Sequence, residues 1–245
     1  LQLAAALPVG GEGAARTLPI DFIQAPTPAR PRKNASEQDW IEYRKLRKDM
    51  NINRQALPRV NRLVEACSSP QVGHPLWLTV DGRFTNSTML KHLPPGQVLI
   101  GRIRGDATLY GLAPAGPTGG RPRQYGPRQP TPEQFGQDQT VAWTSVEAFA
   151  AGKRHAFRIK TLSPVKWRSA GVDKDLRLIV IAPLGYRLSK NSRKLYRKAA
   201  YLICTDPTLP LEQVLQAYLW RWGIEVNFRD EKTLIGVGQA QIRNP

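Results

Sequence analysis

The fold is decided near the C-terminus, by residues 211–234, which read LEQVLQAYLWRWGIEVNFRDEKTL. The stretch contains no proline, and its apolar residues recur at helical spacing. We therefore expect one long amphipathic α-helix from Leu211 to Leu234. On a helical wheel, one face roughly 80° wide carries a phenol and four charges, namely Tyr218, Arg221, Glu225, Arg229 and Lys232. Apolar residues lie beside this face, so it borders the buried side of the helix.

A carboxylate among cations at the margin of a core has two interpretations. Glu225 can hold a divalent metal while the neighbouring cations bind phosphate oxygens. Alternatively, the stripe is a solvated helix face on which Arg221 and Glu225 form an i,i+4 ion pair, which stabilises a helix by about 0.2–0.5 kcal/mol. Spacing alone leaves both interpretations open.

Four of these residues have a recognisable spacing, Tyr-x2-Arg-x3-Glu-x6-Lys, at Tyr218, Arg221, Glu225 and Lys232. Together with the surrounding YLWRWGIEVNFRDEK, this resembles the signature of the insertion-sequence transposases of the DDE, RNase H-like superfamily. The resemblance covers most of the chain in layout. It is specific only in this helix and in the strand that ends at Asp81.

Composition narrows the function independently of any motif. The 245 residues are 41% hydrophobic, which supports a globular fold, and the formal net charge is +17. Such a charge favours polyanionic partners, with nucleic acid first and an anionic membrane surface second. No run of about 18 apolar residues is present. We expect Cys67 and Cys204 to be free thiols of a reducing cytoplasm, and the scattered histidines argue against a zinc site.

The first third of the chain predicts a hairpin followed by two helices. Residues 1–10 and 16–25 are expected to be strands joined by a glycine-rich turn, with Asp21 as an outward-facing strand residue. A helix is expected from Glu37 to Met50, with Ser36 as its N-cap. A second helix is expected around residues 56–67.

A second informative stretch begins at Leu76. The apolar run Leu76–Val80 is typical of a central strand covered on both faces, and it ends at Asp81. In open α/β sheets, ligands bind just beyond the carboxyl ends of strands, so Asp81 is a candidate catalytic carboxylate. The alternative interpretation is a turn aspartate before a glycine, which is a common pattern. Asp106, after the next strand, is a rival candidate that also suits an ion pair.

The second half alternates loop and strand. Residues 111–139 are rich in Gly, Pro and Gln and predict a mobile loop or linker. Strands are expected at residues 154–168, 176–183 and 199–206. Between the last two strands, residues 186–198 interleave tyrosines with cations, which suits nucleic-acid binding by Arg193, Lys194 and Arg197. A solvated hairpin loop explains the same pattern.

The resemblance implies an α/β fold, with an RNase H-like mixed sheet flanked by helices and a β-rich insertion before the last helix. Residues 1–110 would form the first part of the core, residues 111–206 the loop and strand insertion, and residues 207–245 the final part with the catalytic helix. The first Asp of the family precedes the first two strands, so we expect this chain to be a fragment that is inactive without it.

The resemblance also implies a chemistry. Asp81 and Glu225 would be catalytic and would ligate Mg²⁺ or Mn²⁺ in a two-metal site. Tyr218, Arg221, Arg229 and Lys232 would bind DNA. The intact protein would be an endonuclease and transposase that acts as a dimer on double-stranded DNA, at transposon ends and targets. It would work in the bacterial cytoplasm at the nucleoid, without a membrane.

Two rival functions follow from the same residues. The first is a nucleic-acid-binding domain derived from a transposase, which retains the charge without the catalysis. The second is a Mg²⁺-dependent RNase H-like nuclease that cleaves DNA without strand transfer. Metal-dependent nicking distinguishes an enzyme from a binding domain, and end joining distinguishes a transposase from a nuclease.

Overall fold

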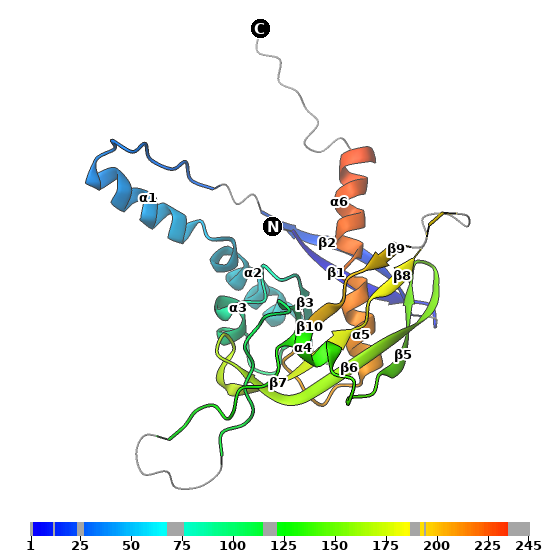
Figure 1. Ribbon diagram of the computed structural model, residues 1–245. Coiled ribbons are helices and arrows are strands. Elements are labelled where there is room, and N and C mark those ends of the chain that lie inside the picture. The colour runs from blue at the N-terminus through cyan, green and yellow to red at the C-terminus, as the bar shows by residue number, and fades with distance from the viewer. Residues whose placement is uncertain are drawn as a thin grey trace. The chain divides into compact units, whose positions relative to one another are not determined.

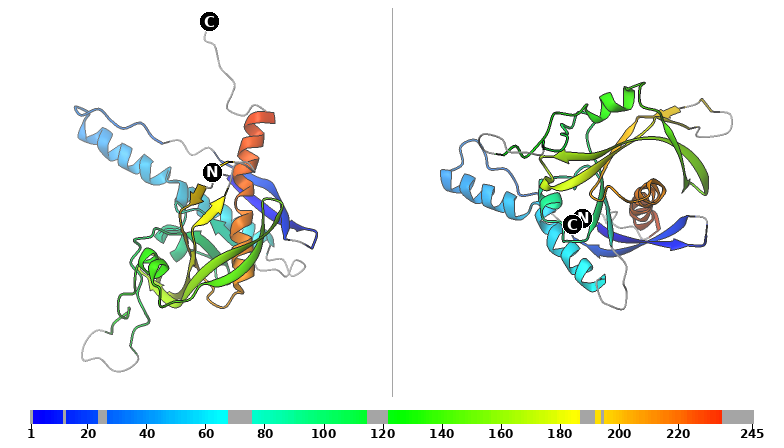
Figure 2. Two further views of the ribbon diagram at one scale, coloured as in Figure 1. Left: turned by 45° about the vertical axis from the view of Figure 1, so that its right-hand side comes forward. Right: turned by 90° about the horizontal axis from the view of Figure 1, so that it is seen from below.

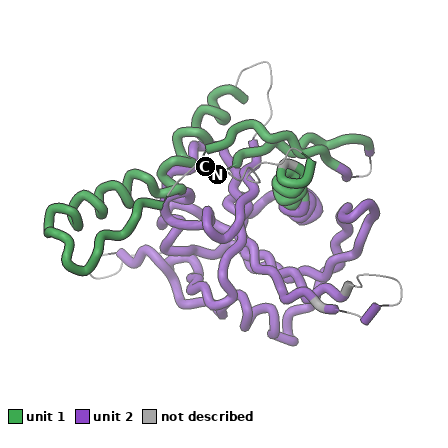
Figure 3. The backbone as a smooth tube through the Cα atoms, turned by 90° about the horizontal axis from the view of Figure 1, so that it is seen from above, with its two compact units in different colours: residues 1–10, 15–74, 220–245 green, residues 11–14, 75–219 purple. Residues whose placement is uncertain are grey.

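The structure of the protein is a computed structural model, which describes residues 2–11, 13–23, 27–67, 76–114, 122–186, 192–193 and 195–234. The chain falls into two compact units (Figure 3). Unit 1 comprises residues 1–10, 15–74 and 220–245, and unit 2 comprises residues 11–14 and 75–219. Unit 1 therefore contains both ends of the chain. The predicted boundaries at residues 110 and 206 do not coincide with those of the units.

Unit 1 contains a β-hairpin and three helices (Figure 1). Their bounds are β1 Gln2–Val9, β2 Ala14–Phe22, α1 Glu37–Asp49, α2 Ile52–Cys67 and α6 Gly223–Leu234. The predicted N-cap is confirmed, because Ser36 Oγ accepts a hydrogen bond from Asp39 N at 3.1 Å and Asp39 Oδ2 accepts one from Ser36 N at 2.9 Å. Asp21 is half-buried and pairs with Arg59 of α2 at 3.1 Å, so it ties the hairpin to that helix.

Unit 2 is built on one mixed sheet of six strands in the order β3-β4-β10-β7-β6-β5. Strands β3 and β4 are parallel, and the remaining neighbours are antiparallel. The strands are β3 Trp77–Val80, β4 Val98–Arg102, β5 Thr144–Ala150, β6 Lys153–Trp167, β7 Gly171–Ile181 and β10 Ala200–Cys204. The helices are α3 Ser87–Lys91, α4 Pro132–Gln137 and α5 Leu211–Trp220, and β8 Leu184–Tyr186 pairs with β9 Leu195–Arg197 in a separate hairpin. This confirms the predicted α/β class with a mixed sheet flanked by helices.

The core of unit 2 lies where the sheet curls around α5 (Figure 2, right). Alternate residues of each strand point toward this helix, as the pleat of a strand requires. Val214, Leu215 and Ala217 of α5 are buried against them. The sheet contributes Val98, Ile100, Val146, Ala148, Phe157, Ile159, Ile179, Ile181, Leu202 and Cys204 to the same cluster. Burial of this cluster contributes to the stability of unit 2 through the hydrophobic effect.

The opposite face of β7 is covered by α4. Val180 alternates with the core residue Ile179, and a Cβ on Gly136 of α4 would lie 3.1 Å from Val180 Cγ1. The helix begins with a capping box, in which Thr131 Oγ1 accepts a hydrogen bond from Gln134 N at 3.2 Å. The prediction of a loop or linker over residues 111–139 is therefore wrong for residues 132–137.

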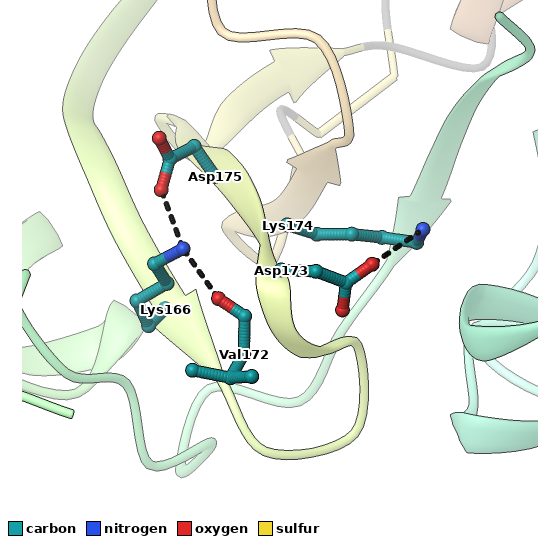
Figure 4. Close-up of polar contacts among 5 residues, drawn as sticks. All are labelled: Lys166, Val172, Asp173, Lys174 and Asp175. Atoms are coloured by element: carbon teal, nitrogen blue, oxygen red, sulfur yellow. Dashed lines mark hydrogen bonds and ion pairs between the residues drawn. The ribbon is translucent and has the colours of Figure 1, made fainter. Parts of the chain in front are cut away.

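The hairpin between β6 and β7 is held by polar contacts near its turn (Figure 4). Lys166 Nζ lies 2.7 Å from Asp175 Oδ1 and donates a hydrogen bond to Val172 O at 2.6 Å. Asp173 lies 3.4 Å from Lys174 Nζ. The pKa of the Asp173 carboxyl is lowered, mainly because the carboxylate accepts a hydrogen bond from the backbone N–H of Asp173. These contacts fix the far end of the long β6–β7 ribbon.

Two sequence predictions are corrected. Leu76–Val80 was expected to be a central strand, but β3 is the edge of the six-stranded sheet and pairs only with β4 among the described strands. The stretch 211–234 was expected to be one helix, but it forms α5 and α6 with a turn at residues 221–222. The turn precedes Gly223, where a Cβ would lie 2.0 Å from Thr17 Oγ1 of β2. A close tertiary approach, together with the low helix propensity of glycine, accounts for the interruption.

Candidate functional site

Asp81 directly follows β3 and is fixed by its own turn. Its Oδ1 accepts hydrogen bonds from the backbone N–H groups of Arg83 at 2.9 Å and Phe84 at 3.3 Å. Its backbone oxygen accepts from Thr85 Oγ1 at 2.8 Å. Oδ2 accepts no hydrogen bond from any residue that the structure describes. Asp81 is therefore a turn aspartate, as the alternative interpretation predicted. Its Oδ2 is nevertheless available to a ligand.

The Asp81 turn rests against β4 through a glycine. A Cβ on Gly101 would lie 2.2 Å from Thr85 Oγ1 and 2.9 Å from Val80 Cγ2. Only glycine lets Thr85 approach the strand closely enough to bond the Asp81 carbonyl. The sequence places a glycine inside a strand here, which is the signal for such a close approach.

The rival carboxylate Asp106 is engaged in an ion pair. Arg104 Nε and Nη2 lie 2.8 and 2.7 Å from its two carboxylate oxygens, in a bidentate arrangement. The hydrogen bond from Arg104 lowers the pKa of Asp106. Both oxygens of Asp106 therefore have a cationic partner, whereas Asp81 has none among the described residues. This favours Asp81 for a catalytic role.

A groove of about 1040 Å³ lies at the carboxyl ends of β3 and β4, within unit 2. Its lining includes Gly82, which follows Asp81, and the cations Arg102, Arg104 and Lys198. The aromatic residues of the lining are Trp143, Trp167 and Tyr201. Its volume of about 1040 Å³ is slightly above the usual range for ligand sites, about 300–1,000 Å³. We call this cavity the β3–β4 groove.

Sequence reasoning missed the β3–β4 groove because its walls come from distant segments. Trp143 precedes β5, Trp167 ends β6 and Tyr201 lies on β10. Each is half-buried, so none is a fully packed core residue. The available signal was aromatic residues close to cations at strand ends, which is typical of nucleic-acid-binding surfaces.

The signature residues of the C-terminal stretch are divided between the two helices. Tyr218 lies in α5 and packs against the core cluster of unit 2. Arg221 lies in the turn, and its Nη2 is 3.2 Å from Glu225 Oε1 in the first turn of α6. The Glu225 side chain is 43% exposed and that of Arg221 is 18% exposed. The structure thus brings Arg221 and Glu225 together, as the ion-pair interpretation predicted.

The remaining cations of the prediction lie on exposed positions. Lys232 is exposed in the last turn of α6, and Arg229 pairs with Asp230 at 3.1 Å. Arg193 and Arg197 are exposed, and Arg197 is paired with Leu184 in the register of the β8–β9 hairpin. Lys194 lies outside the described residues. The predicted hairpin is therefore confirmed, and its DNA contacts stay a prediction.

The two predicted metal ligands belong to different units, Asp81 to unit 2 and Glu225 to unit 1. The ability of each side chain to ligate a metal ion is therefore considered separately. Mg²⁺ takes hard oxygen ligands and usually keeps several waters, so one or two carboxylates can hold it together with substrate phosphates. Asp81 offers Oδ2, and Glu225 keeps Oε2 beside the oxygen that faces Arg221. Both side chains fit the chemistry of a magnesium ligand.

Comparison with known proteins assigns no family to the chain. A scan against models of protein families finds no match, and a search of curated proteins finds none either. Among the described residues, none of the helices has the length and apolar character needed to cross a bilayer.

Proposed function

We propose that this chain is the catalytic domain of a DNA transposase of the DDE, RNase H-like superfamily, which cleaves and joins phosphodiester bonds with Mg²⁺. The observation that carries the proposal is the position of Asp81 at the carboxyl end of β3, next to the cation-lined β3–β4 groove. Ligands of open α/β sheets bind just beyond the carboxyl ends of the strands. The Tyr-x2-Arg-x3-Glu-x6-Lys spacing and the net charge of +17 are further support.

The roles follow from the chemistry of each side chain. In this proposal, Asp81 and Glu225 supply the oxygen ligands of the metal site. Bound divalent metal assists phosphoryl transfer by activating the attacking oxygen and stabilising the leaving one. Arg221 pairs with Glu225 at 3.2 Å and orients its carboxylate, and its guanidinium can also bind phosphate oxygens. Tyr218 and the exposed Lys232 position the DNA backbone. The substrate is double-stranded DNA held by a dimer, at transposon ends and targets in the bacterial nucleoid.

A second candidate is a nucleic-acid-binding domain without catalysis. The Arg221–Glu225 ion pair and the hydrogen bonds at Asp81 Oδ1 favour it, because both carboxylates are then stabilised by the protein alone. The basic groove would still bind DNA by counterion release. A plain nuclease shares the carboxylate chemistry and differs only in the absence of strand transfer.

The proposal is tested by a plasmid-nicking assay. The natural gene product that contains these residues is incubated with supercoiled plasmid, and nicking is measured. Asp81→Asn and Glu225→Gln should each lower Mg²⁺-dependent nicking more than about 100-fold, because even outer-shell partners of metal ligands cost about 10–100-fold. The matched control is Asp106→Asn, which should retain nicking because Asp106 is already paired with Arg104. Nicking that survives Glu225→Gln, or is absent from every version, contradicts the proposal. An end-joining assay then separates a transposase from a nuclease.

A further inference from the structure

A short segment at the start of β2, residues 13–17, contacts both C-terminal helices. Its first residue, Gly13, lies against Gln216 of α5, and its last, Thr17, lies against Gly223 of α6. The first of these contacts lies within unit 2 and the second within unit 1 (Figure 3). We call residues 13–17 the β2 start. It is bound in each of the two units.

The contact within unit 2 leaves room only for glycine. Gln216 pairs with the backbone of β5, since its Oε1 accepts a hydrogen bond from Phe149 N at 2.8 Å and its Nε2 donates one to Phe149 O at 3.0 Å. A Cβ on Gly13 would lie 3.0 Å from both Gln216 Oε1 and Phe149 Cβ. Gly13 also has φ +95°, where residues with a side chain are strained. The turn of the hairpin therefore packs closely on an amide that is itself fixed by two hydrogen bonds.

The contact within unit 1 sets the rotation of α6 about its axis. Thr17 O accepts a hydrogen bond from Asn227 Nδ2 at 3.3 Å, and a Cβ on Gly223 would lie 2.0 Å from Thr17 Oγ1. Residues four apart lie on one face of a helix, so Gly223 and Asn227 both face β2. Glu225, midway between them, lies roughly 160–200° around the helix from each. Thr17 therefore fixes the direction in which Glu225 points, away from β2.

The turn between α5 and α6 explains why such a contact matters. The helix is interrupted at residues 221–222, and α6 begins directly afterwards. Rotation of a few backbone dihedrals in a short connection moves the whole element that follows it. Glu225 lies in the first turn of α6 and would move with it. A displacement of about 1 Å at a reacting group can lower a rate about 100-fold.

We propose that the β2 start fixes the direction of α6 relative to α5, and that Gly13, Gln216 and Asn227 are positioning residues for Glu225. The restriction of α6 rests on the contacts alone. Its effect on catalysis rests on the proposed function, in which Glu225 ligates the metal ion. These three residues touch neither the metal ion nor DNA in this account, because they act through the orientation of the helix.

The first test measures the distance between spin labels on the two helices by pulsed electron paramagnetic resonance. The labels are attached at Gln213→Cys in α5 and Leu234→Cys in α6, two exposed positions. The natural gene product that contains these residues is used, with its accessible cysteines, including Cys67, replaced by serine and the buried Cys204 retained. One narrow distance distribution is expected, because the β2 start restricts α6.

Two substitutions should release the helix. Gly13→Ala breaks the close contact in unit 2, and Asn227→Ala removes the hydrogen bond in unit 1. Each should broaden the distance distribution or shift its mean. Gly10→Ala is the matched control, because Gly10 also has a positive φ, +69°, but a Cβ there meets no described atom within 4 Å. It should leave the distribution unchanged.

Three results would overturn the inference. The first is a distribution that is already broad in wild type, and the second is a distribution that neither variant changes. The third is an equal change in Gly10→Ala, since hairpin strain would then account for the effect of Gly13→Ala. Circular dichroism checks folding. Should either variant fail to fold, Gln216→Met, which keeps the length of the side chain and removes both hydrogen bonds to Phe149, must broaden the distribution instead.

The second test asks whether this restriction serves catalysis. Plasmid nicking is measured over a series of Mg²⁺ concentrations. Gly13→Ala and Asn227→Ala should raise the Mg²⁺ concentration for half-maximal nicking by about 10- to 100-fold, the usual effect of losing a residue that orients a metal ligand. A variant that is merely less stable would lose nicking in proportion to its unfolded fraction at an unchanged half-maximal concentration. That outcome would contradict the positioning role.

The two tests separate this inference from the proposed function. Broadened distances in variants of a protein that never nicks DNA would support the restriction of α6 and reject the catalytic proposal. Variants with broadened distances and an unchanged Mg²⁺ dependence would leave the catalytic proposal intact and reject the positioning role of Gly13 and Asn227.

Discussion

The two C-terminal helices are adjacent in sequence but differ in their environment. In α5, Val214 and Leu215 are buried at 0% and 2% exposure within the core cluster of unit 2. In α6, none of the described side chains is buried, and Leu234 is 80% exposed. Tyr218 lies on the buried helix, and Glu225 and Lys232 lie on the accessible one. The Tyr-x2-Arg-x3-Glu-x6-Lys stretch therefore contains one residue that packs against the core, Tyr218, and two that are exposed to solvent, Glu225 and Lys232.

The largest effect should come from truncating the buried leucine of α5. Leu215→Ala should lower the free energy of unfolding by about 2–5 kcal/mol, because it removes methylene groups and leaves a cavity in the core. The matched change Leu234→Ala in α6 should stay within about 0.5 kcal/mol. Urea denaturation measures both. Similar losses for the two variants would show that α5 and α6 do not differ in packing as described.

A pH titration provides a second probe of the α5 core. Burial raises the pKa of the Cys204 thiol from 9.0 to about 11. The folded state therefore holds this proton more tightly than the unfolded state, and the resulting stability is complete below pH 9. It is lost as the pH rises through about 11, by roughly 2–3 kcal/mol.

The readout is the difference in unfolding free energy between wild type and Cys204→Ala as a function of pH. Subtraction removes the titration of lysines and of Tyr201, whose pKa is also raised by burial. The difference should shrink between pH 9 and pH 11. A difference that stays constant over that interval would mean that the thiol is accessible in the folded protein.

The junction of the helices should resist a normally favourable substitution. Gly→Ala within a helix usually stabilises by about 1 kcal/mol. At Gly223 the new Cβ would lie 2.0 Å from Thr17 Oγ1 and 2.8 Å from Thr17 Cβ, so Gly223→Ala should destabilise by about 1–3 kcal/mol. Gly11→Ala, with no atom within 4 Å of its Cβ, is the control. Thermal melts that rise for Gly223→Ala would refute the close contact.

The smallest stability effect concerns the ion pair. Glu225→Gln should lower the free energy of unfolding by only about 0.2–0.5 kcal/mol, because the pair with Arg221 is an i,i+4 helix pair with an exposed acid. Asp230→Asn, which removes a comparable exposed pair with Arg229, should behave alike. A loss above about 2 kcal/mol would show that Glu225 has a structural role. Loss of nicking in Glu225→Gln would then no longer be evidence that Glu225 is catalytic.

Local chemistry made part of the fold predictable. Ser36 and Asp39 signal the start of α1 by themselves, and the strand patterns at residues 154–168, 176–183 and 199–206 correspond to β6, β7 and β10. The capping signature of Thr131 and Gln134, with proline between them, was also available, but the surrounding glycines and prolines obscured it. Periodicity and capping are local properties, so sequence alone reveals them.

Non-local pairing accounts for the failures. Among the described strands β3 pairs only with β4, which leaves it at the edge of the sheet, and no pattern within Leu76–Val80 encodes this. The break before Gly223 depends on Thr17, about two hundred residues earlier. The candidate site was predictable as far as Asp81 and the Arg221–Glu225 pair, each of which is set by neighbours in sequence. The β3–β4 groove was not, because its rings converge only in the folded sheet.

Whether Asp81 and Glu225 ligate the same metal ion can be measured by iron-mediated backbone cleavage. Fe²⁺ bound in place of Mg²⁺ generates hydroxyl radicals with ascorbate and peroxide, and these cut the chain next to the ion. A shared site predicts cuts near both residue 81 and residue 225, suppressed together by excess Mg²⁺ and by either Asp81→Asn or Glu225→Gln. Cuts near only one of the two positions, or cuts that survive both substitutions, would contradict it.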